Sequence, residues 1–342
     1  MDAVRQIADA VLYEGYVLWP YRRSALKNTR RWTFGGVYPR AHSQEHPDDR
    51  WTMRTECLVE GPPEATVDVR VRFLHVVRRQ VMGQAPSGAL EPVDELTVDG
   101  ERYLTWEEAT ERELEATALP LGELGSPKHI DIAIAPWRDE EQLPGGALVR
   151  TSSELEGGVD LAAEALRPGL HRLSVQLTNT TPMPKHPARP GAPGLVSAAG
   201  DREEALERTF CSTHTVLSAD GAQFVSLTDP PPELREEAEG CSNEGTWPVL
   251  VGEPGSRDTL LSSPIILEDH PRIAPESPGD LFDGGEIDGL LTLNILSLTD
   301  EEKAEMRDSD PRTREILERT ENLSEEEMMR LHGAIRDLRH VN

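Results

Sequence analysis

The sequence ATVDVRVRFLHVVRRQVMG (65–83) indicates a long β-strand. Apolar and polar residues alternate along most of it, which is typical of a strand that buries one face. RWTMRTECLVEG (50–61) and GLHRLSVQLTNTTP (169–182) carry the same pattern. Turn residues recur between such stretches, which is typical of an antiparallel sandwich. The sequence therefore predicts a mainly β protein with an antiparallel β-sandwich-like body.

Turn signals divide this body further. Asp99-Gly100 in ELTVDGERYLTW (95–106) predicts a hairpin, and Asp220-Gly221 in THTVLSADGAQFVSL (213–227) predicts another. The segment 182–202 holds five Pro and three Gly among its 21 residues, so we expect a surface loop there.

Both ends of the chain show helical periodicity. DAVRQIADAVL (2–12) predicts a short N-terminal helix, and the pattern becomes helical again from about residue 284. Two capping boxes and an Asp-Pro start signal support short helices in this tail: Thr299/Glu302, Ser324/Glu327 and Asp310-Pro311. We therefore divide the chain into a β-rich body, 1–283, and an acidic helical tail, 284–342.

Composition excludes several classes of protein. The 342 residues include 35 Lys+Arg and 62 Asp+Glu, a formal net charge of −27, which disfavours general binding to nucleic acid. No apolar run approaches the roughly 18 residues of a membrane span. GxGxxG and GxxxxGK[ST] motifs are absent from the sequence, so no nucleotide cofactor is expected. These features are typical of a soluble, cytoplasmic protein.

Positive charge and aromatic rings concentrate in the segment 13–40. Residues 1–40 contain seven basic and three acidic residues, a net charge of +4. Such a segment could seal one end of the sandwich, stack on nucleic acid or dock on a protein, since Tyr, Trp and Arg serve in all three roles. We take the following residues as the candidate interaction set: Tyr13, Tyr16, Trp19, Tyr21, Arg22, Arg23 and Lys27.

Carboxylates cluster near the body–tail boundary. Asp280, Asp283 and Glu286 in PESPGDLFDGGEIDGLL could hold a hard cation, although their spacing does not match an EF-hand. Helix capping, a solvated turn or a partner surface would explain the same acids. Glu268, Asp269 and His270 follow an apolar run and form an alternative acid/base set, or an ordinary strand-to-turn transition.

The three cysteines are widely separated in the sequence. Cys57, Cys211 and Cys241 form neither a secreted disulfide framework nor a CxxC knuckle, so we expect buried or half-buried thiols. A Cys211–Cys241 pair with His214 nearby could form a metal or redox site, although the spacing Cys211-x-x-His214 is a weak signal, and a reactive thiol without metal is a third alternative.

Two blocks of the chain resemble a known family. LYEGYVLWPYRRSALKNTRRWTFGGVYP (12–39) and the block that runs from EDHPRIAPESPGDLFDGGEIDGLL through LTDEEK to AIRDL (268–338) are similar to an uncharacterised bacterial family. That family is associated with genes for high-affinity, oxygen-tolerant nickel–iron uptake hydrogenases. The resemblance implies an accessory role beside a hydrogenase subunit or maturation protein. The chain lacks the CxxC pairs of a nickel-insertion zinc site and the Cys-rich signature of an iron–sulfur carrier, which argues against direct metal delivery.

Two hypotheses follow from these observations. The first is a non-enzymatic accessory or assembly protein of a nickel–iron hydrogenase system, which docks through the 13–40 segment. The alternative is a metal-dependent enzyme that uses the carboxylates of 268–288.

Overall fold

The computed structural model describes residues 35–184 and 197–271. It also describes a smaller set of helical or helix-flanking positions near the two ends: Ile7, Ala8, Leu12, Thr299, Asp300, Lys303, Ala304, Arg307, Arg314, Leu317, Glu318, Glu321 and Asn322. Within these residues the protein is mainly antiparallel β-sheet, which confirms the predicted fold class at that level.

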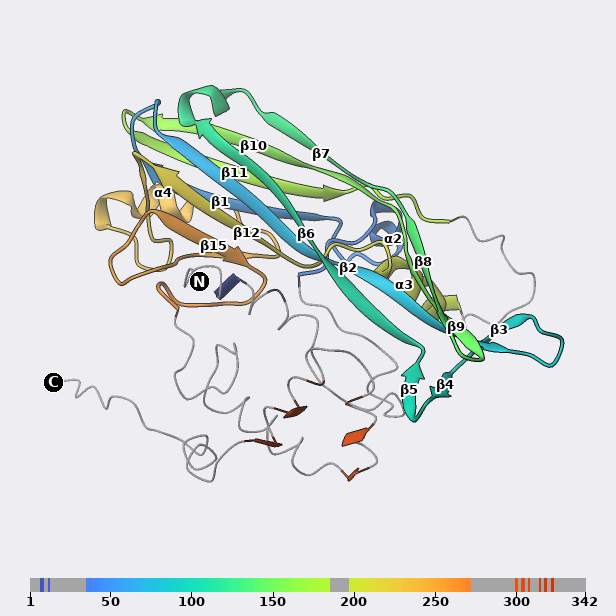
Figure 1. The fold of residues 1–342 in the computed structure, drawn as a ribbon. Coiled ribbons are helices and arrows are strands. Elements are labelled where there is room, and N and C mark those ends of the chain that lie inside the picture. The colour runs from blue at the N-terminus through green and yellow to red at the C-terminus, as the bar shows by residue number, and fades with distance from the viewer. Residues whose placement is uncertain are drawn as a thin grey trace.

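The smaller sheet has five antiparallel strands in the order β13-β1-β11-β10-β7 (Figure 1). The five strands span Gln223–Phe224 (β13), Thr52–Glu60 (β1), Leu170–Asn179 (β11), Leu155–Arg167 (β10) and Lys128–Ile134 (β7). The alternating stretches 50–61 and 169–182 form β1 and β11. These two strands pair with each other along nearly their whole length.

The larger sheet has eight strands built around one long strand, β2 (Thr66–Gln84). One edge of β2 pairs first with β12 and further along with β9, while the other edge pairs first with β6 and then with β3. The sheet also contains β15 and β14 beyond β12, and β8 beyond β9. These strands span Cys211–Asp220 (β12), Gly146–Ser152 (β9), Trp106–Pro120 (β6), Leu90–Val93 (β3), Thr259–Ser263 (β15), Trp247–Leu250 (β14) and Trp137–Leu143 (β8).

The main core lies between the two sheets. Alternate residues of β1, β2, β10 and β11 enter it, among them Cys57, Val69, Phe73, Leu161 and Val175. Phe73 and Phe210 contact each other there with ring centroids 4.7 Å apart. Burial of this apolar face is the main free-energy gain on folding, which is why the period-two stretches predicted the sheets.

Short elements complete the described fold. The hairpin of β4 (Glu95–Val98) and β5 (Glu101–Leu104) turns at Asp99 and Gly100, both with positive φ, as predicted. It lies beside the far half of β2, where β9, β8 and β3 extend as an arm from the rest of the sheets (Figure 1). Within residues 35–184 and 197–271 the helices are α2 (Arg40–Glu45), α3 (Ser197–Leu206) and α4 (Arg235–Glu239), with 3₁₀ turns η1 (Leu121–Gly125) and η2 (Pro232–Leu234).

Some elements differ from the sequence predictions. The predicted hairpin at Asp220-Gly221 is wrong, because β12 belongs to the larger sheet whereas β13 pairs with β1 in the smaller one. The turn therefore crosses between the sheets. Helix α3 begins at Ser197, inside the stretch predicted as a loop. The predicted elements include no strand at β6 or β8, whose sequences are rich in acidic residues.

Candidate functional site

The interaction set lies outside the described residues, but the chain is fixed on both sides of it. Before the set, Leu12 is fully buried and packs with Leu74, Val76 and Cys211 on the outer face of the larger sheet. Ile7 and Ala8 pack into a neighbouring apolar cluster on the same face. We refer to Ile7, Ala8 and Leu12 as the N-terminal anchor.

The second fixed point begins at Gly35. Its carbonyl accepts a hydrogen bond from the Thr213 amide at 3.0 Å, and Val37 exchanges two backbone hydrogen bonds with Phe210 at 3.0 and 3.1 Å. Gly35 has a φ of +61°, and a Cβ there would lie 2.5 Å from the Pro264 ring. Only glycine fits this combination of backbone conformation and close packing. The segment 13–34 is therefore tethered at both ends to the same body.

The two acidic candidate sets are placed differently. Asp280, Asp283 and Glu286 lie outside the described residues. In the alternative acid/base set, Glu268 is exposed, whereas the Asp269 carboxylate accepts hydrogen bonds from the Ser226 and Thr228 hydroxyls at 2.5 and 2.7 Å.

Asp269 and His270 also cover the edge strand β14. The amide of Leu250 donates to the Asp269 carboxylate at 2.8 Å, and the amide of His270 donates to the Leu250 carbonyl at 2.7 Å. Pro248, two residues earlier, has no amide hydrogen to offer at this edge. Uncovered edge groups invite pairing with another chain, so these contacts protect the sheet. An acid/base role for the set stays a prediction.

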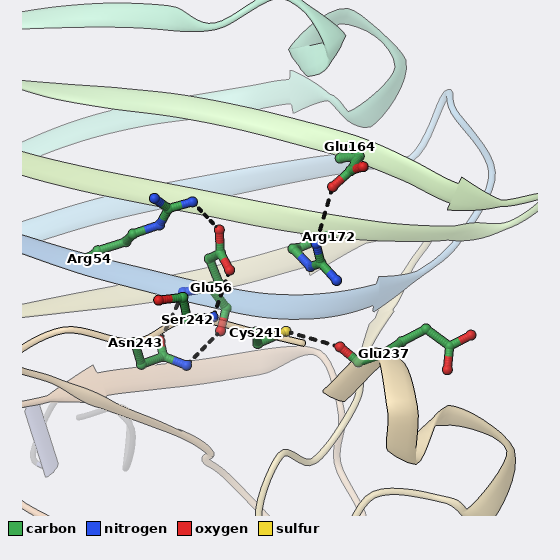
Figure 2. Close-up of polar contacts among 8 residues, drawn as sticks. All are labelled: Arg54, Glu56, Glu164, Arg172, Glu237, Cys241, Ser242 and Asn243. Carbon is green, nitrogen blue, oxygen red and sulfur yellow. Dashed lines mark hydrogen bonds and ion pairs between the residues drawn. The ribbon is translucent and has the colours of Figure 1, made fainter. Parts of the chain in front are cut away.

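A polar cluster that the sequence did not reveal lies on the outer face of the smaller sheet. Figure 2 shows Glu56 of β1 directed at the loop that follows α4. Its carboxylate is almost fully buried, pairs with Arg54 and accepts the Ser242 amide at 2.7 Å. The Asn243 carboxamide accepts from the Glu56 amide at 2.8 Å and donates to the Glu56 carbonyl at 3.1 Å. Asn243 thus replaces a backbone partner of β1.

We refer to residues 232–246, which contain η2, α4 and this loop, as the cover. Besides the Asn243 contacts, Arg54 and Glu244 form an antiparallel bridge. Leu234 and Ala238 pack on Leu58 of β1. The cover is therefore held to the sheet by both polar and apolar contacts.

Cys241 lies within the cover beside Arg172 (Figure 2). Burial raises the pKa of the Cys241 thiol, and the Arg172 guanidinium only partly offsets this effect. Arg172 also contacts Glu164 at 3.2 Å. A thiol with a raised pKa is a weak nucleophile at neutral pH, so the cluster is suited to hold the cover in place rather than to attack a substrate.

Cys211 and His214 share one face of β12 because of a bulge. The register with β2 shifts between these two residues, and Ser212 there has a positive φ of 51°. Both side chains are fully buried, and the His214 Nε2 has no hydrogen-bond partner. Burial, together with the Arg72 cation, lowers the pKa of His214 to about 3, so the imidazole is neutral. All three cysteines are free, with Cys57 and Cys211 buried and Cys241 half-buried, as expected.

In the part of the chain that the structure describes, no three His, Cys, Asp or Glu side chains are arranged to hold a metal ion. None of the helices described is long and apolar enough to cross a membrane.

Comparison of the chain with protein-family models, with curated proteins and with solved structures finds no match in any of the three. The similarity to a hydrogenase-linked family therefore stays a prediction from the two sequence blocks.

Proposed function

We propose that this chain is a non-enzymatic accessory or assembly protein of a nickel–iron hydrogenase system, which acts by binding another protein. The binding segment is 13–34, with Tyr13, Tyr16, Trp19, Tyr21, Arg22, Arg23 and Lys27 as its contact residues. Trp, Tyr and Arg are enriched among the few interface residues that contribute most to the binding free energy.

The observation that supports this proposal is the tethering of the segment at Leu12 and Gly35. A segment whose two ends are fixed has fewer conformations to lose when it binds than a free terminus has. The positive charge of the segment itself favours contact with an acidic surface on the partner. The hydrogenase system is taken from the sequence resemblance alone.

The test is affinity purification of the tagged chain from its native host, with bound proteins identified by mass spectrometry. We expect a hydrogenase subunit or maturation protein to co-purify. Arg22→Glu combined with Arg23→Glu should abolish this capture, because it reverses the charge of the segment at two adjacent positions.

The matched control is Lys128→Glu combined with Arg235→Glu, which makes the same change in net charge on exposed residues of the body. It should leave capture unchanged. Circular dichroism of each variant shows whether the fold is retained. Equal capture by the folded Arg22/Arg23 variant, or capture that never includes a hydrogenase component, contradicts the proposal.

The same purified sample decides the alternative. A metal-dependent enzyme working from 268–288 requires a stoichiometric divalent ion, which elemental analysis detects. One tightly bound ion without any protein partner would favour that function. The Asp269 carboxylate already accepts hydrogen bonds from Ser226, Thr228 and the Leu250 amide of β14. We therefore rank the metal-dependent enzyme second.

A further inference from the structure

His129 lies on β7, an edge strand of the smaller sheet, and faces its neighbour β10. In the register of the two strands His129 is opposite Asp160, and Asp131 is opposite Gly158. The His129 Nδ1 is 2.7 Å from the Asp160 carboxylate, and its Nε2 is 3.3 Å from the Asp131 carboxylate. The imidazole therefore bridges two acids, one on each strand.

Gly158 makes this position of the ring possible. A Cβ at Gly158 would lie 2.3 Å from the His129 Cε1, far inside van der Waals contact. The imidazole can therefore lie against the β10 backbone between the two carboxylates only because residue 158 has no side chain.

The two contacts need different numbers of protons. Neutral imidazole carries one N–H, so it can donate to one carboxylate while its second nitrogen presents a lone pair to the other. Imidazolium donates to both. The hydrogen bond with Asp160 is the largest of the effects that raise the pKa of His129, and the charge of Asp131 acts in the same direction.

The other charged groups on the neighbouring elements do not form this bridge. The other charged groups of β10 are Glu156, Glu164 and Arg167, and those of the neighbouring elements are Lys128 on β7, Glu123 on η1 and Arg172 on β11. Arg167 and Arg172 pair with Glu237 and Glu164. The carboxylates of Asp131 and Asp160 lie at opposite nitrogens of the ring, so they do not converge on a common point where a cation could replace the imidazole.

We propose that His129 is a proton-dependent latch that holds the edge strand β7 on β10. When the imidazole is charged, it joins the strands through both carboxylates. When it loses its proton, one of the two contacts is lost and β7 separates more readily from the sheet. This strand matters because only Ala135 and Pro136 separate it from β8 of the larger sheet.

The direction of the effect follows from the raised pKa. Both imidazole–carboxylate contacts are fully formed below the ordinary imidazole pKa of 6.5. One of them is lost as the pH rises through the higher pKa that His129 has in the folded protein. All three side chains are substantially exposed, so the contacts are screened by water and the change is modest.

Amide hydrogen exchange of the β7 backbone tests the latch. After correction for the intrinsic exchange rate, protection of 130–134 should fall by about twofold to fivefold as the pH rises from about 5.5 to about 8.5. His129→Gln, which does not titrate, should abolish this dependence on pH. Asp160→Asn should weaken it and should lower the His129 pKa, as followed by NMR.

The control is Glu156→Gln, an exposed carboxylate on β10 that does not contact the imidazole. It should keep the full pH dependence. The proposal is overturned if β7 protection in the unchanged chain is independent of pH, or if His129→Gln keeps the same dependence. These outcomes are independent of whether segment 13–34 binds a hydrogenase component.

Discussion

Asn243 shows how a single side chain can complete a sheet. Its carboxamide satisfies both the amide and the carbonyl of Glu56, which are shielded from water by the cover. A buried backbone group without a partner costs about 1–3 kcal/mol. Nothing in the pattern SNEG (242–245) separates this asparagine from one in an ordinary turn.

Asn243→Ala should therefore lower the free energy of unfolding by about 2–6 kcal/mol, because the Glu56 amide and the Glu56 carbonyl each lose their partner. Urea unfolding at neutral pH measures this change. Ser242→Ala is the neighbouring control, since Ser242 contacts Glu56 through its backbone amide, which alanine retains. If the two variants lose equal stability, the Asn243 side chain has no such role.

Two buried histidines should make the protein sensitive to mild acid. Burial, assisted by nearby arginines, lowers the pKa of His75 to about 4 and that of His214 to about 3. The unfolded chain binds a proton at these residues below pH 6.5, whereas the folded chain does not. Stability is therefore lost as the pH falls from 6.5 toward these values.

His214→Asn removes one of these titrations while keeping a side-chain donor for the Ser212 carbonyl. We expect the variant to be less stable than the unchanged chain at neutral pH. Between pH 6.5 and about pH 5, however, its free energy of unfolding should fall by roughly 1.5 kcal/mol less than that of the unchanged chain. Urea unfolding at a series of pH values measures both slopes. Parallel slopes would show that His214 is not neutral in the folded protein.

At the scale of elements, β6 is a strand made largely of helix-forming residues. Its sequence WEEATERELEATALP favours a helix by intrinsic propensity. In the structure it pairs with β2 over most of its length, and Glu111, Glu113 and Glu115 meet Arg70 and Arg72 across the strands. Cross-strand ion pairs and core burial thus outweigh propensity. The alternation of Glu at 111, 113 and 115 was the available signal for a strand.

Reversing one charge tests the importance of this pairing. Arg72 is nearly buried, and Glu113 is one of two carboxylates 3.3 Å from its guanidinium. Glu113→Lys should reduce stability by about 1–3 kcal/mol, because it replaces an acceptor of a buried cation with a like charge. Thermal unfolding with Glu123→Lys, an exposed residue on η1, is the comparison. If Glu113→Lys and Glu123→Lys lower thermal stability by the same small amount, the Glu113 contact with Arg72 does not contribute to stability.

At the scale of the whole molecule, the outer face of the larger sheet receives the N-terminal anchor. Leu12 is completely buried there although it is separated from Leu74 by more than fifty residues of sequence. The anchor fixes one end of the proposed binding segment, and the turn at Gly35 fixes the other. The described body is therefore the frame on which that segment is held.

Leu12→Ala should release one end of the segment and weaken partner capture by roughly tenfold, since binding must then also order that end. A titration of the captured hydrogenase component measures the affinity. Leu90→Ala, at a leucine of β3 that is already 38% exposed, should leave the affinity unchanged. Unaltered binding by Leu12→Ala would mean that tethering contributes nothing.

Several parts of the fold follow from local sequence: the β class, the strands β1, β2 and β11 and the hairpin at Asp99-Gly100. In each, local residues decide: alternation selects the buried face, and Asp-Gly accepts positive φ. The sequence also indicated the aromatic, basic segment and the acidic charge of the chain, which are properties of composition.

Tertiary packing, in contrast, selected the sheet that each strand joins, and so placed Asp220-Gly221 at a crossing between the two sheets. It also decided that Asp269 covers an edge, that Asn243 completes β1 and that His129 bridges two carboxylates. These roles depend on groups brought together from distant parts of the chain. No local pattern specifies such partners, because they are selected by burial of the common core and by the hydrogen bonds that burial then requires.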